Sequence, residues 1–263
     1  MSIDAMRISD ELSPVTLESL SGAPAAAAVG VTKIYGLGDA AVKALDDVSI
    51  EFEAGRFTAI MGPSGSGKST LLQCVAGLDE VTSGKVYVGA TDVTALNEKG
   101  RTRLRRDEIG FIFQSFNLIP TLTAAANIAL PSTLAGRDDD QTWKESVIAT
   151  LGLEDRLSHR PSELSGGQQQ RVAVARALSG RPKVVFADEP TGSLDSKRGA
   201  EILAFMRKAV DEFGQTIVMV THDPISASTA DRVVFLADGR IAHILDNPTV
   251  DTILDRMRSL EGR

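Results

Sequence analysis

The chain has 263 residues, a formal net charge of −7 at pH 7, 43% hydrophobic residues and 24% charged residues. This balance is typical of a globular protein with a full core, and the acidic charge argues against a broad nucleic-acid-binding surface. The single cysteine, Cys74, excludes an intrachain disulfide, and its apolar neighbours predict a buried, unreactive thiol. No apolar stretch approaches the ~20 residues that cross a bilayer, and the amino terminus lacks a signal-peptide pattern. We therefore expect a cytoplasmic protein that reaches a membrane only through a partner.

Hydrophobic periodicity and turn residues divide the chain into alternating strands and helices. Residues 1–28 show neither period and are predicted to form a disordered leader. Beyond the leader, strands are predicted at 29–35, 44–52, 57–61, 84–89, 111–113, 183–187, 216–220 and 232–237, and helices at 69–77, 143–151, 168–178, 197–213 and 249–260. The alternation predicts an α/β fold with a largely parallel sheet covered on both faces. Residues 115–165, rich in helical stretches and prolines, indicate an inserted helical subdomain.

The segment Gly62–Thr70 fits the phosphate-loop pattern G-x-x-x-x-G-K-[ST] between a predicted strand and a predicted helix. Its glycines let the backbone wrap a triphosphate with the N–H groups inward, and the helix N-terminus favours the anion. Lys68 is placed to reach the β- and γ-phosphates, and the Ser69 hydroxyl is a candidate magnesium ligand. A flexible glycine–serine turn is the alternative, but the pattern arises by chance in only roughly 1% of chains this long. The predicted nucleotide-binding residues are Gly62, Pro63, Ser64, Gly65, Ser66, Gly67, Lys68, Ser69 and Thr70.

A second candidate site is the apolar strand that ends in Asp188 and Glu189. A magnesium nucleotide hydrolase needs carboxylates at the carboxyl edge of its sheet. Asp188 can hold the metal, and Glu189 can polarise the water that attacks the γ-phosphate. A strand ending in an acidic turn is the alternative, but the phosphate loop upstream favours the metal site.

A third candidate site is Leu164–Gln168, directly before a predicted helix. It combines the Ser165 hydroxyl, two glycine amides and a helix N-terminus, which together form a small-residue anion site. As a bare pattern, it is equally a capped helix start.

In this order and spacing, the three motifs resemble those of the ATPase subunit of an ABC transporter, over about residues 29–246. The resemblance implies roles for four further residues. Tyr35 is similar to the aromatic residue that stacks on adenine, although an isolated tyrosine is usually a core residue. Gln114 matches the glutamine that senses magnesium and water and links to the membrane partner. Asp195 matches a loop that crosses the dimer interface, and His222 matches the histidine that contacts the γ-phosphate.

The resemblance also implies the cofactors and the partners. ATP and Mg²⁺ are the implied cofactors; the implied metal site is Ser69, Gln114 and Asp188, and the implied catalytic residues are Glu189, His222 and Gln114. Two copies would close head-to-tail, so that each ATP is also contacted from the partner chain by Ser165, Gly166, Gly167, Gln168 and Asp195. Located on the inner face of the cell membrane, the protein would use hydrolysis to drive integral membrane permease subunits. The resemblance implies no nucleic-acid partner and no direct insertion into the membrane.

The implied fold is a P-loop NTPase core at residues 29–114 and 166–246, with an N-terminal antiparallel β portion, a helical subdomain at 115–165 and a C-terminal helix within 247–263. Ala59–Thr70 and Leu104–Pro120 carry a narrower resemblance, to lipoprotein-release, macrolide-export and antimicrobial-peptide-resistance ATPases, and to the cell-division ATPase. That subgroup implies an exporter or a mechanotransmission complex whose permease has a large extracytoplasmic domain. Arg101, Arg103, Arg105 and Arg106 fit its pattern as a surface or subunit contact. The alternative function is the ATPase of a cell-division or cell-wall-hydrolase regulating complex that moves no substrate.

Overall fold

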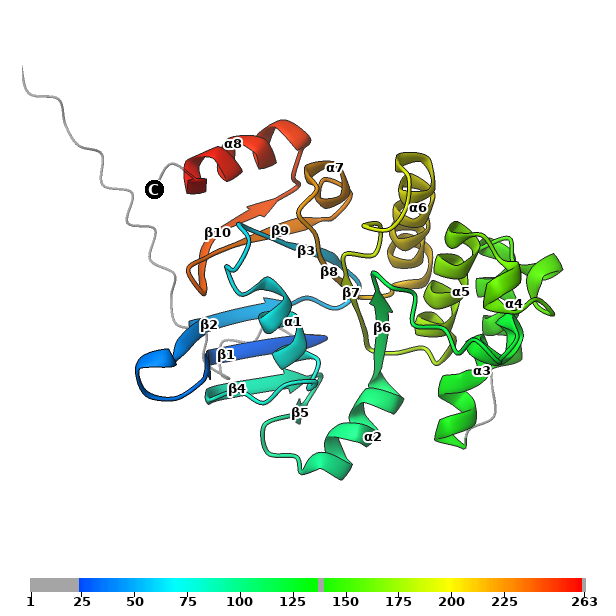
Figure 1. Ribbon diagram of the computed structural model, residues 1–263, viewed down its shortest axis with the longest axis horizontal. Helices are drawn as coiled ribbons and strands as arrows, with labels where there is room; N and C mark the ends of the chain where they lie inside the picture. The colour runs from blue at the N-terminus through cyan, green and yellow to red at the C-terminus, as the bar shows by residue number, and fades with distance from the viewer. Residues whose placement is uncertain (1–23, 137–139, 262–263) are drawn as a thin grey trace, which may run out of the picture.

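A six-stranded sheet forms the centre of the molecule (Figure 1). The computed structural model describes residues 24–136 and 140–261, so residues 1–23 of the predicted leader lie outside the described residues. In spatial order, the strands are β10 (Arg240–Asp246), β9 (Arg232–Ala237), β3 (Phe57–Met61), β8 (Ile217–Val220), β7 (Val184–Asp188) and β6 (Ile109–Phe113). Neighbouring strands from β9 to β6 run parallel, and β10 is antiparallel to β9. The predicted, largely parallel sheet is confirmed.

A second, antiparallel sheet contains β2 (Val42–Phe52), β1 (Ala26–Tyr35), β4 (Ser83–Val88) and β5 (Thr91–Asp92), in this order. It is the antiparallel portion that the resemblance implied. The strand β1 begins at Ala26, so the prediction that the leader extends to residue 28 is wrong. Alanine has a low strand propensity, but Ala26 and Ala28 are fully buried and pair with Phe52 and Ile50. Tertiary packing therefore overrides local propensity here.

Helices cover both faces of the central sheet. They are α1 (Lys68–Val75), α2 (Glu98–Glu108), α3 (Ala124–Ala135), α4 (Gln141–Thr150), α5 (Gly166–Ser179), α6 (Ser196–Phe213), α7 (Pro224–Ala227) and α8 (Val250–Glu261), with short 3₁₀ turns at Gly38–Ala40, Glu154–Arg156 and Pro161–Glu163. In Figure 1, α3 to α6 gather on the side of β6 and β7, whereas α8 lies over β9 and β10. Ile253 of α8 is fully buried, and Met257 and Leu260 pack against the core. The apolar stripe of the last helix therefore docks on the domain.

Successive residues of the central strands face two different cores. In β3, Phe57 and Met61 face a core shared with α3 to α6 and α8, whereas Ile60 faces a core shared with the antiparallel sheet. Because both faces are covered, every residue of β3 is buried, and all of them except Thr58 are apolar. Cys74 of α1 is 1% exposed in the second core, which confirms the predicted buried thiol.

Strand β10 was not among the predicted strands. It follows β9 through Asp238 and Gly239, both at positive φ (49° and 74°). Two such residues form the tight turn that matches strand twist in a hairpin, so the Asp-Gly pair is the signal that could have found this strand.

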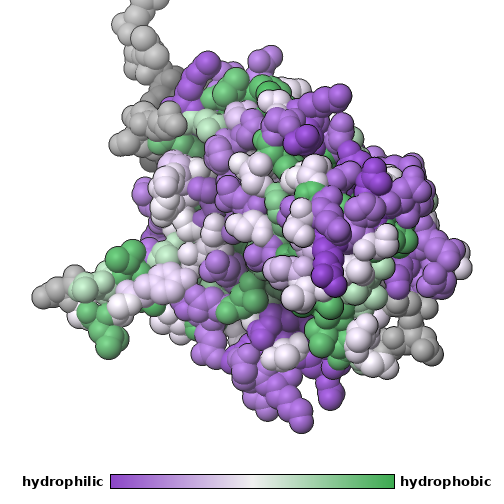
Figure 2. Space-filling view, turned by 45° about the vertical axis from the view of Figure 1, so that its right-hand side comes forward, coloured by the Kyte–Doolittle hydropathy of each residue, from purple (hydrophilic) through white to green (hydrophobic). Residues whose placement is uncertain are grey.

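The outer surface is mainly polar. Figure 2, which brings the side of α3 to α6 forward, shows hydrophilic residues over most of this face and apolar residues in small separate patches. In α2, Arg101 pairs with Glu80 and Glu98, and Arg105 pairs with Glu98, so carboxylates of the same chain neutralise much of the arginine cluster. Across residues 24–136 and 140–261, none of the helices has the length and apolar character needed to cross a membrane.

Candidate nucleotide-binding site

The carboxyl ends of four parallel strands meet at one edge of the central sheet. The strand register pairs Phe113 with Asp188, and it pairs both Asp188 and Ile60 with Val220. The residues that follow these strands are Gln114 after β6, Glu189 after β7, His222 after β8 and the phosphate loop after β3. The fold thus brings these predicted site residues to one edge, which is where open α/β sheets bind their ligands.

The phosphate loop needs glycine at two positions for steric reasons. At Gly62 (φ 147°), a Cβ atom would lie 2.0 Å from the carbonyl oxygen of Leu236. At Gly67 (φ 98°), it would lie 2.3 Å from the carbonyl oxygen of Ala44. No side chain fits at either place, so the loop passes between β2 and β9 as bare backbone.

The β9–β10 hairpin fixes this loop in place. The N–H of Gly239 donates to the carbonyl oxygen of Ser66 at 3.2 Å, and the N–H of Asp46 donates to the carbonyl oxygen of Gly239 at 2.9 Å. Arg240 Nε donates to Asp46 Oδ2 at 2.8 Å. The unpredicted strand β10 therefore supports the predicted loop.

Lys68 folds back over its own loop. Its Nζ donates to the carbonyl oxygens of Gly62 at 2.9 Å and Pro63 at 2.7 Å. Burial lowers the pKa of Lys68, while the charges of Glu189 and Asp188 partly oppose this effect. An anionic phosphate beside the ammonium would favour the charged form further.

Ser69 and Asp188 place two oxygen atoms that could be metal ligands side by side, next to the phosphate loop. Ser69 Oγ donates to Asp188 Oδ1 at 3.3 Å. Burial raises the pKa of Asp188, and the bond from Ser69 opposes this shift. Among the described residues, no group of three or more His, Cys, Asp or Glu side chains could hold a metal ion alone. A hydroxyl and one carboxylate fit Mg²⁺, because this ion is commonly held by one or two side chains together with substrate phosphates.

Glu189 and His222 are in direct contact. His222 Nδ1 lies 2.8 Å from Glu189 Oε1. Glu189 has φ 49°, a left-handed conformation that is rare outside glycine and that clusters at functional sites. Its N–H donates to the carbonyl oxygen of Val220 at 3.0 Å, and its own carbonyl oxygen accepts from Gly192 N at 3.0 Å. The backbone therefore holds this carboxylate at the edge of the sheet.

Two other predicted residues flank this edge. Gln114 is exposed, and its carbonyl oxygen accepts a bond from Ser193 Oγ at 3.0 Å, which joins the loop after β6 to the loop after β7. Tyr35 lies at the end of β1, and its hydroxyl interacts with the side chain of Thr70, the last residue of the phosphate-loop motif. Tyr35 is 40% exposed, so it is not the ordinary core tyrosine that was the alternative.

The third motif forms a complete helix cap at the start of α5. Gln168 N donates to Ser165 Oγ at 3.3 Å, and Ser165 N donates to Gln168 Oε1 at 2.8 Å. Asp195 caps the neighbouring helix α6 by accepting from Arg198 N at 3.0 Å. In the part of the chain that the structure describes, no hydrogen bond or ion pair joins Ser165–Gln168 to the phosphate loop. The two predicted anion sites of one chain are thus separate.

Gln170, which was not among the predicted site residues, links helix α5 to the loop that contains Glu189. This side chain is fully buried in α5, and its Nε2 donates to the carbonyl oxygen of Pro190 at 2.6 Å. An amide on the apolar face of a predicted helix is the signal that could have found it, because a buried polar group needs a fixed partner.

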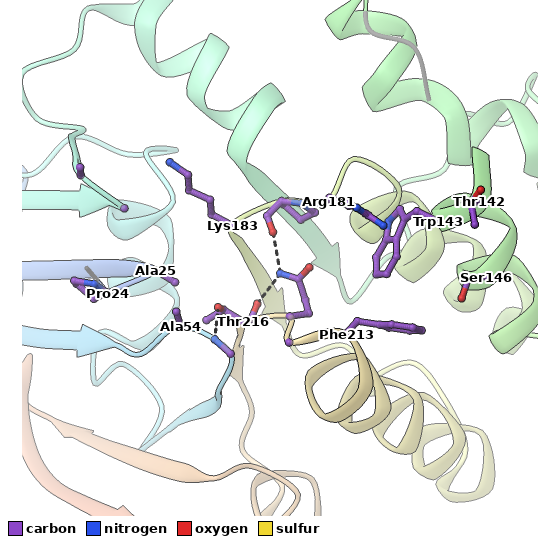
Figure 3. Close-up of a pocket in the computed structure, with 16 residues that line it drawn as sticks. Pro24, Ala25, Ala54, Thr142, Trp143, Ser146, Arg181, Lys183, Phe213 and Thr216 are labelled. Atoms are coloured by element: carbon purple, nitrogen blue, oxygen red, sulfur yellow. Dashed lines mark hydrogen bonds between the residues drawn. The ribbon is translucent and has the colours of Figure 1, made fainter. Parts of the chain in front are cut away.

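A cavity of about 860 Å³ lies at the opposite edge of the sheet (Figure 3). It is lined by residues that precede strands, including Gly55, Lys183 and Thr216, and by Trp143 and Phe213. Trp143 and Phe213 pack edge to face with ring centres 4.8 Å apart, and Trp143 Nε1 donates to the carbonyl oxygen of Leu178 at 2.9 Å. This cavity shares no residue with the predicted nucleotide site.

The sequence of this chain matches a known protein family. A family model described as ABC transporter matches residues 45–192. The ABC transporter ATP-binding proteins MJ1508 and MJ0796 of Methanocaldococcus jannaschii are 48% and 45% identical to this chain. These matches cover 83% of this chain and 98% of MJ1508, and 80% of this chain and 92% of MJ0796.

Two further comparisons concern a longer protein and a solved structure. The macrolide export ATP-binding/permease protein MacB of Burkholderia thailandensis is 46% identical over 84% of this chain, which spans only 34% of MacB. The dimeric structure of the ATP-binding cassette MJ0796 bound to ADP and Pi matches with a TM-score of 0.76 at 40% identity, over 85% of this chain and 99% of that chain. The chain belongs to the ABC transporter family, among its ATP-binding proteins.

Proposed function

We propose that this chain is the ATP-hydrolysing subunit of a membrane exporter or mechanotransmission complex, on the cytoplasmic face of the membrane. The observation that carries the proposal is the edge where the phosphate loop, the Ser69–Asp188 pair and the Glu189–His222 pair converge. The names of the relatives support the transporter: MJ1508 is an ABC transporter ATP-binding protein, and MacB joins an ATP-binding part to a permease.

In the proposed bound state, the N–H groups of the phosphate loop and the N-terminus of α1 hold the phosphates. Lys68 exchanges its bonds to Gly62 and Pro63 for bonds to the β- and γ-phosphate oxygens. Ser69, Asp188 and Gln114 would hold Mg²⁺, which neutralises charge on the phosphate oxygens. Tyr35 stacks on the adenine.

In the proposed chemical step, Glu189 orients a water molecule in line with the γ-phosphorus and accepts its proton. A new oxygen–phosphorus bond forms as the bond to the bridging oxygen breaks, which leaves ADP and phosphate. His222 fixes the Glu189 carboxylate through Nδ1 and keeps Nε2 for the γ-phosphate.

The separation of the two anion sites supports a composite site. The exposed N-terminal cap of α5 lies about a hundred residues from the phosphate loop, and it can bind phosphate if the nucleotide is held by a second copy of the chain. In this arrangement, Ser165–Gln168 and Asp195 of each copy close over the ATP of the other. Opening after hydrolysis passes motion to the permease through the Gln114 loop and the helical subdomain.

Purification of the chain from detergent-solubilised source membranes tests the coupling. We expect a permease with a large external domain to co-purify and the complex to hydrolyse ATP. Recovery of the chain alone, with ATP-dependent dimers and no membrane protein, would contradict the transporter role. Co-purification of a permease together with a cell-wall hydrolase would favour the alternative, a regulating complex that moves no substrate.

A further inference from the structure

Two charged side chains hold Tyr35 in a fixed position. Tyr35 Oη donates to Asp79 Oδ2 at 2.7 Å, and Lys33 Nζ donates to Asp79 Oδ1 at 2.6 Å. Lys33 Nζ also donates to the carbonyl oxygen of Glu80 at 2.6 Å. Asp79 Oδ1 also accepts from Glu80 N at 2.8 Å, so the carboxylate is held by three bonds and joins the lysine to the phenol.

The same lysine covers one face of the tyrosine ring. Lys33 Nζ lies 4.7 Å from the centre of the Tyr35 ring, a distance typical of a cation–π contact. Lys33 is only 9% exposed, whereas Tyr35 is 40% exposed. The ring therefore has one face occupied by a buried cation and presents its remaining surface outward, where a flat ligand can stack.

The charge states of these groups preserve the arrangement. Burial and then the bond to Asp79 raise the pKa of Tyr35 to about 12, so the phenol keeps the proton that it donates. Burial alone would raise the pKa of Asp79, but the bonds from Lys33 and Tyr35 hold it below its usual value. At neutral pH, the Asp79 carboxylate is therefore ionised and accepts from both neighbours.

Resting on the nucleotide site proposed above, we propose that Asp79 and Lys33 are positioning residues that fix the Tyr35 ring for stacking on the nucleotide base. The two residues contact Tyr35 and the backbone near α1 and make no bond to the phosphate loop among the described residues. Asp79 and Lys33 therefore influence the affinity for the nucleotide through the contact between Tyr35 and the base, and they leave the contacts between the phosphate loop and the phosphates unchanged.

The test compares a ligand that has a base with one that lacks it. For the full chain, the KM for ATP, kcat and the inhibition constant of inorganic tripolyphosphate are measured in the wild type and in Asp79→Asn. Since base–aromatic stacking contributes substantially to binding, we expect Asp79→Asn to raise the KM for ATP about threefold to tenfold. Both kcat and the inhibition constant of tripolyphosphate should change by less than about twofold. Glu80→Gln is the matched control, because Glu80 is the adjacent carboxylate and its side chain pairs with Arg101.

A double variant separates positioning from a general loss of structure. Tyr35→Phe removes the hydroxyl that Asp79 holds, so Tyr35→Phe combined with Asp79→Asn should raise KM no further than the larger single change. Additive effects, an unchanged KM in Asp79→Asn, or a parallel rise for tripolyphosphate would each overturn the proposal. Lys33→Gln provides a second variant if Asp79→Asn does not fold.

The same measurements distinguish a failure of the proposed ATPase function from a failure of the proposed role of Asp79 and Lys33. If the wild-type chain does not hydrolyse ATP, the proposed function fails. Dissociation constants for ATP and tripolyphosphate, measured by calorimetry, then still test the role of Asp79.

Discussion

His222 Nδ1 lies 2.8 Å from Glu189 Oε1, although 33 residues separate the two in the chain. The contact follows from topology, because Glu189 directly follows β7, His222 lies two residues after the end of β8, and these two parallel strands are adjacent. The His222 side chain is 75% exposed and the Glu189 side chain 21% exposed, so the histidine covers the carboxylate from the solvent side. A ligand on the phosphate loop would therefore meet both groups together.

Replacing Glu189 with glutamine should nearly abolish ATP hydrolysis while ATP binding persists. The amide keeps the size of the side chain but cannot accept the proton of the attacking water, and general-base catalysis contributes about 10²- to 10⁴-fold. Phosphate release is the measurement, together with size-exclusion chromatography in ATP, which should show a trapped dimer. Glu212→Gln, in an ion pair with Lys208 on the surface of α6, is the control. Hydrolysis by Glu189→Gln at the wild-type rate would refute the role of Glu189.

Gln170→Leu should lower kcat about tenfold and leave the KM for ATP nearly unchanged. The leucine fills a similar volume, but the carbonyl oxygen of Pro190 loses its donor at 2.6 Å, so the backbone next to Glu189 is less well fixed. Steady-state kinetics give the two constants. Gln141→Leu, at an exposed position of α4, is the control. An equal loss in Gln170→Leu and the control would show that the Pro190 contact has no part in catalysis.

Regular elements and the phosphate loop could be predicted because local residue types determine them. The predicted strand at 57–61 coincides with β3. A short apolar run bounded by Gly55 and Gly62 favours a buried strand over a helix. The order of the motifs along the chain was equally informative. In a parallel sheet the carboxyl ends of strands share one edge, so Gln114, Asp188 and His222 converge there.

Contacts between distant segments could not be predicted in this way. Asp79 follows α1, and only the folded chain brings it within 2.7 Å of Tyr35. The apolar face of its helix marks Gln170 as a buried amide, but only the folded chain shows that its partner is the carbonyl oxygen of Pro190. The start of β1 at Ala26 depends on strands β2 and β4 on either side, which supply the pairing that alanine itself does not favour.

Gly62→Ala should destabilise the protein more than a glycine change at an open site. The new Cβ atom would lie 2.0 Å from the carbonyl oxygen of Leu236, at a φ of 147° that alanine rarely adopts. We expect a loss of about 2 to 4 kcal/mol in the free energy of unfolding, from strain and overpacking. Gly136→Ala is the matched control: its φ is 61° but nothing lies within 4 Å, so only backbone strain of about 1 kcal/mol applies. Equal losses in urea unfolding would contradict the steric account.

Cys74 should resist thiol reagents in the folded protein. Burial raises the pKa of its thiol to about 12, and the thiolate is the reactive form. At pH 8, Ellman's reagent should therefore detect no thiol in the native chain and one thiol after denaturation. Because the unfolded chain ionises first, at the ordinary thiol pKa of about 8.5, the wild type should lose stability relative to Cys74→Ala as the pH rises above that value. Rapid labelling of the native chain would show that the core opens readily at α1.

Ser165→Arg, introduced into the Glu189→Gln variant, should separate nucleotide binding from dimer formation. If Ser165–Gln168 serves the ATP of a second copy, the bulky cation blocks that contact but leaves the phosphate loop of its own chain intact. The calorimetric affinity of the monomer for ATP should then change by less than about twofold, whereas the ATP-dependent dimer should be absent in size-exclusion chromatography. Ser259→Arg, on the exposed side of α8, is the control and should still form the dimer. If Ser165→Arg instead weakened ATP binding by the monomer, the segment would belong to the site of its own chain, and the composite site would be wrong.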